Sequence, residues 1–365
     1  MREVIALYTP LILIAFISAF STVALFVPRL RKFAIRIKAV QEGGGRFVHS
    51  GLMPNIGGIA IFTGFIIALT LASIFKPALI DSYRVELLAI VLGAALMTLV
   101  GFIDDIWEVP PILRLASQTM AASILIVNGI QVGFITNYFN LNGPEYLFFS
   151  NGLSVIITLL WVVGFTNAFN FIDGLDGLSS GIATIASFSL LAVAIQFPDR
   201  GVAILLLTAL AGSSLGFLRH NFSPANIIMG DSGAYMIGYV LAAVSVLGAL
   251  KVTAVVTVAA PIMILALPVL NITQVTLRRL SRGSNPTVAA NDHLHDLIRV
   301  QSGSKQLTVV ILWILALALG ALGMMLSNTP AVLIYLTIAL TVVSIAIVSA
   351  LRYFEAKKEL QIAGN

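Results

Sequence analysis

The sequence predicts an all-α, polytopic membrane helix bundle, and three observations lead to that fold class. Hydrophobic residues make up 59% of the 365 positions, charged residues make up only 10%, and the mean hydropathy is +1.01. Soluble domains carry about 25% charged residues, so this composition excludes an ordinary soluble protein. The apolar residues fall in runs of about 20, the length that a helix needs to cross a bilayer. The chain has no cysteine, which excludes disulfides, thiol nucleophiles and cysteine-based metal sites.

Eleven apolar runs are long enough to be transmembrane helices. They cover residues 7–27, 55–75, 85–103, 112–130, 151–169, 178–197, 202–219, 234–250, 252–275, 306–326 and 330–351. The loops on one side of the membrane are then 28–54, 104–111, 170–177, 220–233 and 276–305, followed by the tail from 352. We expect residues 1–365 to form one integral membrane domain.

The distribution of basic residues predicts the orientation of this domain. With Arg114 and Arg219 assigned to the side of those loops, that side carries sixteen of the 21 Lys and Arg residues and the other side carries five. The positive-inside rule therefore predicts an N-terminus outside the cell and a C-terminus in the cytoplasm. If the eighth and ninth runs formed a single span across the short link at Lys251, the predicted membrane orientation of every later segment would be reversed.

Unusual polar residues gather on the predicted cytoplasmic side only. Five segments carry them, at inner loops or at the span ends that enter these loops: HSGLMPNIGG (49–58), GFIDDIWEVPP (101–111), NAFNFIDGLDGL (167–178), NFSPANIIMGDSG (221–233) and NDHLHDLIR (291–299). A carboxylate in hydrocarbon costs a few kcal/mol, so these side chains need water, a cation or a ligand. Their one-sided placement predicts a single site at the cytoplasmic face.

Two of the segments supply carboxylates that suit a magnesium ion. Asp104 and Asp105 end a span, and Arg114 follows at the start of the next one. Such a pair with a nearby arginine suits Mg²⁺ plus phosphate, although an isolated Asp-Asp pair is more often a solvated loop feature. Asp231 lies between glycines in MGDSG, where Mg²⁺ and a phosphorylated ligand could approach the backbone. A turn aspartate in a glycine-rich loop is the alternative.

The segment NAFNFIDGLDGL places four oxygen-bearing side chains at three-residue spacing. They are Asn167, Asn170, Asp173 and Asp176. On a helix this spacing predicts one polar stripe. A capped break between two spans would explain the glycines and one aspartate, but not four aligned polar side chains.

The last segment supplies two histidines, His293 and His295, after the basic residues Arg278, Arg279 and Arg282. With two-residue spacing the histidines cannot share a helix face, so a zinc site of the HExxH type is not indicated. Histidine can donate to a phosphate or a sugar hydroxyl. A solvated basic loop is the alternative.

Taken together, these segments supply what phosphoryl transfer requires. Carboxylates can bind Mg²⁺, arginine and histidine can bind phosphate, and amides such as Asn167 can bind a sugar or base. On this chemistry Arg114, Arg282 and Asn167 are candidate substrate-binding residues. Because the site lies at the membrane face, we expect one substrate to be a lipid phosphate.

In their order along residues 45–300, the five segments resemble the polyprenyl-phosphate N-acetylhexosamine-1-phosphate transferases, the bacterial branch of glycosyltransferase family 4 in particular. The resemblance implies transfer of a sugar-1-phosphate, most simply N-acetylglucosamine-1-phosphate, from a UDP-sugar to undecaprenyl or another polyprenyl phosphate, with release of UMP. The product would initiate a cell-surface glycan such as O-antigen or teichoic acid.

The resemblance also implies roles for individual residues. Asp104, Asp105 and Asp231 would be catalytic, and Asp231 and Asn170 would be associated with Mg²⁺. Contacts with the substrates are implied for the remaining motif residues: Asp173, Asp176, Asn221, His293 and His295. Either a direct attack by the lipid phosphate or a two-step route through an aspartyl phosphate is compatible with the sequence.

Three other functions compete with this one. A phospho-MurNAc-pentapeptide transferase is disfavoured because the loop 49–58 lacks that branch's lysine and DHLHD differs from its three histidines. A CDP-alcohol phosphotransferase would need an arginine and trailing aspartates that DGLDGLSSG lacks. A cation-coupled transporter would carry its acids at mid-span and show internal repeats.

We therefore expect Mg²⁺ as the cofactor, with Mn²⁺ as a substitute. The expected partners are a UDP-N-acetylhexosamine, a polyprenyl phosphate and the lipid bilayer, with a second copy of the chain as a candidate and no nucleic acid. The expected location is the inner (plasma) membrane, with the site facing the cytoplasm. The sequence leaves open the identity of the sugar and the length of the lipid.

Overall fold

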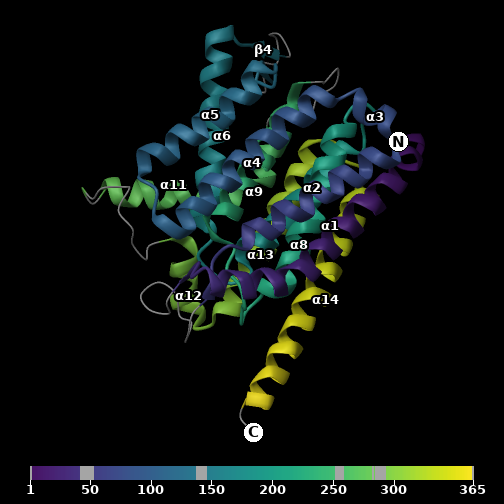
Figure 1. Ribbon diagram of the computed structural model, residues 1–365. Coiled ribbons are helices and arrows are strands. Elements are labelled where there is room, and N and C mark those ends of the chain that lie inside the picture. The colour runs from purple at the N-terminus through teal and green to yellow at the C-terminus, as the bar shows by residue number, and fades with distance from the viewer. Residues whose placement is uncertain are drawn as a thin grey trace.

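A computed structural model of the chain describes residues 2–41, 53–136, 146–250, 259–281, 283 and 293–363, and these are mainly helical (Figure 1). The helices are α1 (Arg2–Arg36), α2 (Gly57–Phe75), α3 (Pro77–Asp81), α4 (Arg84–Trp107), α5 (Pro111–Val127), α6 (Asn151–Ile172), α7 (Leu178–Ala194), α8 (Gly201–Asn221), α9 (Gly230–Leu250), α10 (Ala259–Ile264), α11 (Ala266–Ser281), α12 (Leu294–Ser302), α13 (Lys305–Leu326) and α14 (Ala331–Ala363). Two short antiparallel hairpins join them. In one, β1 (Val40–Gln41) pairs with β2 (Met53–Pro54), and in the other β3 (Phe134–Thr136) pairs with β4 (Tyr146–Phe148).

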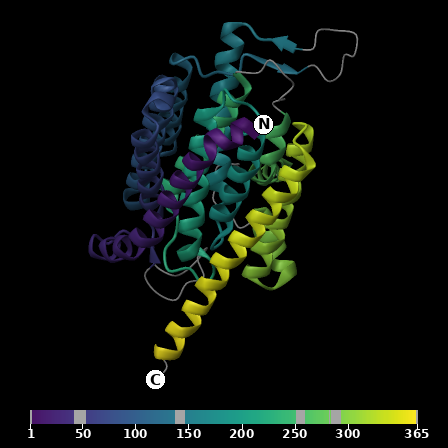
Figure 2. The same cartoon turned by 90° about the vertical axis from the view of Figure 1, so that its right-hand side faces the viewer.

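Eight helices in the described part of the chain are long and apolar enough to cross a membrane: α1, α2, α4, α6, α8, α9, α13 and α14. Helices α5 and α7 are also apolar but have 17 residues each. The predicted all-α, polytopic membrane fold is thereby confirmed. The long helices run alongside one another, and the two chain ends lie at opposite ends of the bundle (Figures 1 and 2).

The degree of burial separates central helices from peripheral ones. The apolar stretch of α8 is fully buried and that of α9 is 94% buried. In α14 only 22% of the apolar stretch is buried. A helix that is apolar on all sides belongs in the centre of a bundle or in lipid. The exposed side of α14 carries large apolar side chains such as Leu336, Leu340 and Ile347, as expected of a lipid-facing surface.

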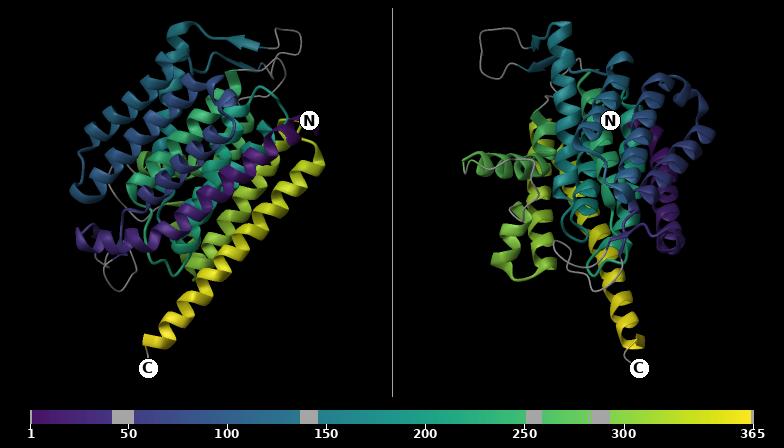
Figure 3. Two further views of the ribbon diagram at one scale, coloured as in Figure 1. Left: turned by 45° about the vertical axis from the view of Figure 1, so that its right-hand side comes forward. Right: turned by 60° about the vertical axis from the view of Figure 1, so that its left-hand side comes forward.

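The ninth predicted span, 252–275, differs from the structure. Its first residues lie outside the described ranges, and the rest forms two helices, α10 and α11, with a break at Leu265. Pro268 explains the break, because a proline ring clashes with the carbonyl group four residues earlier, here that of Ile264. Helix α11 then projects sideways from the bundle (Figure 1; Figure 3, right, green).

The helix ends that carry the polar segments meet at one end of the bundle. Helix α4 packs against α9, and so does α6. The last turns of α4 and α6 approach the first turn of α9, because hydrogen bonds connect Asp105 and Asn170 to Asp231. The predicted polar stripe from 167 to 176 on one helix is wrong. Helix α6 ends at Ile172, so Asp173 and Asp176 lie in the link to α7.

Candidate active site

A cavity of about 560 Å³ opens where these helix ends meet. It is lined by residues from the ends of α4 and α6, the start of α9, the first turn of α5 and the β1–β2 hairpin: Val40, Gln41, Asn55, Asp104, Asp105, Ile106, Glu108, Arg114, Asn170, Asp173, Ile228, Gly230 and Asp231. Six of the sequence-predicted site residues are therefore in one place, although the sequence separates the first from the last by more than a hundred positions.

Asp105 holds the N-terminus of α9. Its Oδ1 accepts a hydrogen bond from the backbone N–H of Asp231 at 2.6 Å, and its Oδ2 accepts from the backbone and hydroxyl groups of Ser232 at 3.2 and 2.8 Å. The first N–H groups of a helix have no partner within the helix, and they carry partial positive charge. Asp105 therefore satisfies these groups from a neighbouring helix.

Two glycines allow the helices to approach closely enough for this contact. A Cβ added at Gly101 on α4 would clash with the backbone of Asp231 and Ser232, and one added at Gly58 on α2 would clash with the backbone of Ser232 and Gly233. Both glycines contact the first turn of α9 directly. They fix the position of that turn, and therefore of Asp231, against α2 and α4.

Asp104 has a different set of partners. Its Oδ1 contacts the guanidinium of Arg114 at 2.8 Å and accepts a hydrogen bond from the backbone N–H of Val109, also at 2.8 Å. The hydroxyl of Tyr235 donates to its Oδ2 at 3.2 Å. Asp104 thus combines a buried carboxylate with the cation that the sequence predicted beside it.

Asp231 lies between Asp104 and Asn170. The amide Nδ2 of Asn170 donates to Oδ1 of Asp231 at 2.5 Å, and the carboxyl group of Asp104 also contacts that of Asp231. Because the Asn170 nitrogen faces Asp231, its carbonyl oxygen is directed elsewhere, and it accepts no hydrogen bond from the described residues. Two carboxyl groups and an amide oxygen are the ligand types that Mg²⁺ prefers.

Asp173 lies at the cavity wall, in the link after α6. Burial raises the pKa of its carboxyl group to about 7 from the ordinary value of 3.8. The hydroxyl of Ser179 opposes this rise, and the negative charge of Asp176 adds to it. Asp176 itself accepts a hydrogen bond from the backbone N–H of Ala225 at 3.3 Å, which connects the 173–177 link to the loop before α9.

Two of the predicted substrate-binding asparagines do not line the cavity. The side-chain amide of Asn167 exchanges hydrogen bonds with that of Gln118, at 2.7 and 3.3 Å, and thereby joins α6 to α5. Asn221 is 4% exposed, and its Oδ1 accepts from the N–H of Gly177 and the hydroxyl of Ser180. Its Nδ2 donates to the carbonyl oxygen of Ile227. In this structure both side chains connect elements around the cavity, and their contact with substrate stays a prediction.

The two histidines lie side by side, although residues two positions apart cannot share a helix face. Their rings stack with centroids 5.3 Å apart and planes within 3°. They can do so because His293 precedes α12 with extended backbone, and only His295 is on the helix. Asn271 of α11 donates to Nδ1 of His293 at 3.5 Å, and its Oδ1 accepts from the N–H of Leu294. Arg282, the other predicted residue of this region, lies outside the described residues.

Three polar cavity residues were not predicted from the sequence: Gln41, Asn55 and Glu108. Asn55 belongs to the polar segment 49–58, so the sequence indicated that this segment lies near the site but did not single out Asn55. Its Nδ2 donates to Asp105 at 3.4 Å, and its Oδ1 is buried without a hydrogen-bond partner among the described residues. The Oε1 atom of Gln41 is likewise buried, with no partner in the part of the chain that the structure describes. These two oxygens can accept hydrogen bonds from a ligand in the cavity.

The cavity is rich in acidic side chains. Its described lining contains five carboxyl groups, those of Asp104, Asp105, Glu108, Asp173 and Asp231, and a single basic side chain, that of Arg114. A phosphate-bearing ligand would be repelled by such a lining unless cations accompany it. The donor set and the charge therefore both fit a divalent cation bound together with a phosphorylated substrate.

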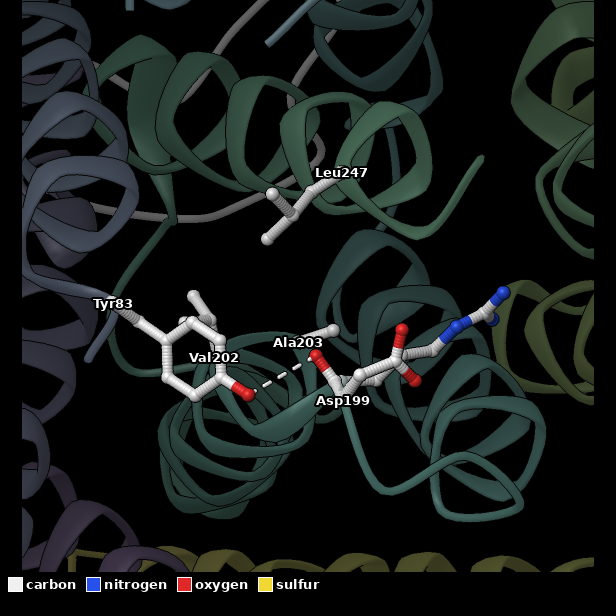
Figure 4. Close-up of a pocket in the computed structure, with 6 residues that line it drawn as sticks. Tyr83, Asp199, Val202, Ala203 and Leu247 are labelled. Carbon is white, nitrogen blue, oxygen red and sulfur yellow. Dashed lines mark hydrogen bonds between the residues drawn. The ribbon is translucent and has the colours of Figure 1, made fainter. Parts of the chain in front are cut away.

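A second pocket lies at the other end of the same helices, between the residues that precede α4 and α8 (Figure 4). There the hydroxyl of Tyr83 points to the carbonyl oxygen of Asp199 and donates to it at 3.3 Å, with Leu247 opposite. Its volume is about 10 Å³, which is room for roughly one water molecule. The larger, charged cavity is therefore the candidate active site.

Comparison with known proteins finds a family and several relatives that are similar to this chain. The family model of glycosyl transferase family 4 matches residues 87–249. A Bacillus subtilis protein named probable undecaprenyl-phosphate N-acetylglucosaminyl 1-phosphate transferase is 30% identical over 309 residues, covering 83% of this chain and 82% of that protein. The decaprenyl-phosphate N-acetylglucosaminephosphotransferase of Mycolicibacterium smegmatis is 32% identical over 314 residues, covering 80% and 77%. The phospho-N-acetylmuramoyl-pentapeptide-transferase of Shouchella clausii is 30% identical over 246 residues, covering 65% and 73%.

Proposed function

Because the chain belongs to glycosyl transferase family 4, we propose that it transfers N-acetylglucosamine-1-phosphate from UDP-N-acetylglucosamine to a polyprenyl phosphate. The products are UMP and a lipid diphosphate that carries the sugar. The observation that carries this proposal is the acid-lined cavity at the ends of membrane helices, where Asp104, Asn170 and Asp231 meet. The resemblance predicted from the motifs is thus confirmed at the level of the family.

The choice of sugar rests on the relatives. The Bacillus subtilis and Mycolicibacterium smegmatis relatives, named for N-acetylglucosamine transfer, match 83% and 80% of this chain, whereas the Shouchella clausii relative, named for N-acetylmuramoyl-pentapeptide transfer, matches 65%. The departures of the loop 49–58 and of DHLHD from the peptidoglycan branch point the same way. A cation-coupled transporter is disfavoured because the carboxylates of the cavity lie at helix ends rather than at mid-span.

We assign the Mg²⁺ ligands to Asp231 and Asn170, with Asp104 alongside. Asn170 would bind the ion by turning its amide so that the oxygen takes the place of the nitrogen that donates to Asp231. When bound, the ion would neutralise charge on the diphosphate of the donor. Among the described residues no three acidic or histidine side chains form a complete metal cage. Mg²⁺ does not need one, since it keeps several waters and takes further ligands from substrate phosphates.

The residues of the chain divide the remaining work. Asp104 orients the phosphate of the lipid or accepts its proton, because Asp105 is fully occupied by α9 and Asn55. An oxygen of that phosphate attacks the sugar-proximal phosphorus of the donor, and the bond from this phosphorus to UMP breaks. Arg114 pairs with Asp104, and Asp173 at the cavity wall contacts the rest of the donor. The stacked histidines are not among the residues that line the cavity, and their contact with the donor is what the motif resemblance implies.

We further propose eleven transmembrane segments, with the N-terminus outside, the C-terminus in the cytoplasm and the cavity facing the cytoplasm of the inner membrane. The excess of Lys and Arg on the side of the motif loops supports this orientation. An odd number of crossings is also supported by the two chain ends, which lie at opposite ends of the bundle (Figure 3, left).

The experiment that tests the role of the cavity compares Asp231→Asn with Asp199→Asn. Both substitutions remove one carboxylate, but Asp199 lines the small pocket at the other end of the bundle. Formation of the sugar-linked lipid diphosphate is measured by mass spectrometry at increasing Mg²⁺ concentrations. Asp231→Asn should abolish product formation, and Asp199→Asn should retain it. Near-normal activity of Asp231→Asn at saturating Mg²⁺ would remove Asp231 from the site.

A further inference from the structure

A second large cavity, of about 410 Å³, opens between α1, α8 and α14. It is lined by Pro28, Arg31, Lys32, Ile35, Arg219, His220, Asn226, Glu355 and Glu359, and it shares no residue with the candidate active site. The loop between α8 and α9 separates the two cavities, because Asn226 lines one of them and Ile228 the other. Helices α1 and α14 both pack against α8 and form the two sides of the opening.

The charges in this cavity leave a positive excess on α1. The two carboxylates that line the cavity are already paired. Glu355 pairs with Arg219, and Glu359 pairs with Arg352 at 3.4 Å. Arg31 and Lys32 are exposed, and the structure gives them no ion pair with any described residue. These two cations are therefore available to an anionic ligand.

The cavity also presents hydrogen-bond acceptors. The Oδ1 atom of Asn226 is buried and has no hydrogen-bond partner within the described ranges, and the paired carboxylates of Glu355 and Glu359 retain further lone pairs. A bare anion would leave these acceptors unused. A ligand that carries hydroxyl groups next to a phosphate would use both the cations and the acceptors.

Apolar side chains continue from the cavity toward the middle of the bilayer. Leu25 lies seven residues before Lys32, on the same face of α1, and is 67% exposed. Leu351 lies one turn before Glu355 on α14 and is also exposed. A molecule with its charged end in the cavity can therefore extend its acyl chains along these two helices.

We propose that this cavity binds the headgroup of an anionic phospholipid of the bilayer, with phosphatidylglycerol as the type that fits its mixture of cations and hydroxyl acceptors. Arg31 and Lys32 contact the phosphate, and Asn226 accepts a hydrogen bond from a headgroup hydroxyl. Basic pockets between transmembrane helices on the cytoplasmic side are known to bind anionic headgroups. The proposal does not depend on the transferase reaction.

The test is native mass spectrometry of the full chain in detergent, incubated with phosphatidylglycerol or with phosphatidylcholine of the same acyl chains. The wild-type protein should retain phosphatidylglycerol in preference. The double variant Arg31→Gln/Lys32→Gln should bind it about tenfold or more weakly, since each basic side chain near the headgroup contributes roughly 1 kcal/mol. The control Lys357→Gln/Lys358→Gln removes the same charge from an exposed stretch of α14 outside the cavity and should bind like the wild type.

A second pair of variants distinguishes a loss of lipid binding from a folding defect. Ile35→Glu places a negative charge in the cavity and Ile35→Gln a neutral side chain of the same size, at an exposed position. Only Ile35→Glu should lose the preference for phosphatidylglycerol. Equal losses in the cavity and control variants would overturn the proposal. So would displacement of the lipid by inorganic phosphate alone, or a raised KM for polyprenyl phosphate in the double variant with phosphatidylglycerol binding unchanged.

Discussion

The carboxylate of Asp105 accepts a hydrogen bond from the backbone N–H of Asp231 at 2.6 Å, so one acidic residue of the cavity holds another in place. Asp105 also accepts from both donors of Ser232 and from Asn55, which occupies about all four lone-pair positions of a carboxylate. Its neighbour Asp104 contacts Arg114 and the carboxyl group of Asp231 instead. The two adjacent aspartates therefore have different roles, and their substitution should have different consequences.

Asp105→Asn should affect stability and turnover together. An amide nitrogen would replace one of the two oxygens that face the N–H groups of α9, which leaves buried donors without a partner. We expect the free energy of unfolding to fall by about 1–3 kcal/mol, and kcat to fall as Asp231 loses its fixed position. Thermal unfolding in detergent and steady-state kinetics measure the two effects. A variant with wild-type stability would show that Asp105 does not anchor α9.

Asp104→Asn should act mainly on turnover. The substitution keeps the shape of the side chain but removes the charge that pairs with Arg114 and the group that can accept a proton. We expect kcat to fall by roughly 10²–10⁴-fold, as is usual for general-base groups. Higher Mg²⁺ or added Mn²⁺ should not restore it if the role is positioning or deprotonation. If both aspartate variants keep the wild-type kcat, the pair is only a loop feature.

Asp173→Asn should stabilise the protein at alkaline pH. Burial raises the pKa of Asp173 to about 7 in the folded state, so the folded state binds more protons than the unfolded state between pH 3.8 and about 7. The wild-type protein therefore loses stability as the pH rises through this window. The unfolding temperature of the variant should exceed that of the wild type at pH 8, and the difference should shrink toward pH 4. A constant difference would contradict the raised pKa.

Asn221→Ala should lower stability and leave the KM for the UDP-sugar unchanged. The side chain connects Gly177, Ser180 and Ile227, and its loss leaves these buried groups unsatisfied at a cost of about 1–3 kcal/mol. Asn128→Ala at the exposed end of α5 provides the control. A large rise in KM with normal stability would instead place Asn221 in contact with the substrate, as the motif resemblance predicted.

The proposed orientation has its own test. A reporter fused after Ala356 should behave as cytoplasmic and one inserted near Asn142, which lies outside the described residues, as external. Both reporters on the same side would contradict the eleven-span arrangement.

Hydropathy and the one-sided placement of polar residues were enough to predict the helix bundle and the gathering of Asp104, Asp105, Asn170, Asp173 and Asp231. Both features depend only on where each residue lies along its own transmembrane span, and this can be read from the neighbouring sequence. The partner of each side chain is not local. Asn167 and Asn170 lie three residues apart on α6, yet one binds Gln118 of α5 and the other Asp231 of α9. Likewise, the stacking of His293 on His295 depends on where α12 begins.

The most direct test of the proposed function is release of UMP by the purified chain with undecaprenyl phosphate and Mg²⁺. Two donors are compared, UDP-N-acetylglucosamine and UDP-N-acetylmuramoyl-pentapeptide, with Asp231→Asn as the inactive control. We predict UMP release from UDP-N-acetylglucosamine, dependent on the lipid phosphate, and little from the pentapeptide donor. UMP release from the pentapeptide donor alone, or none from any UDP-sugar while the protein is folded, would contradict the assignment.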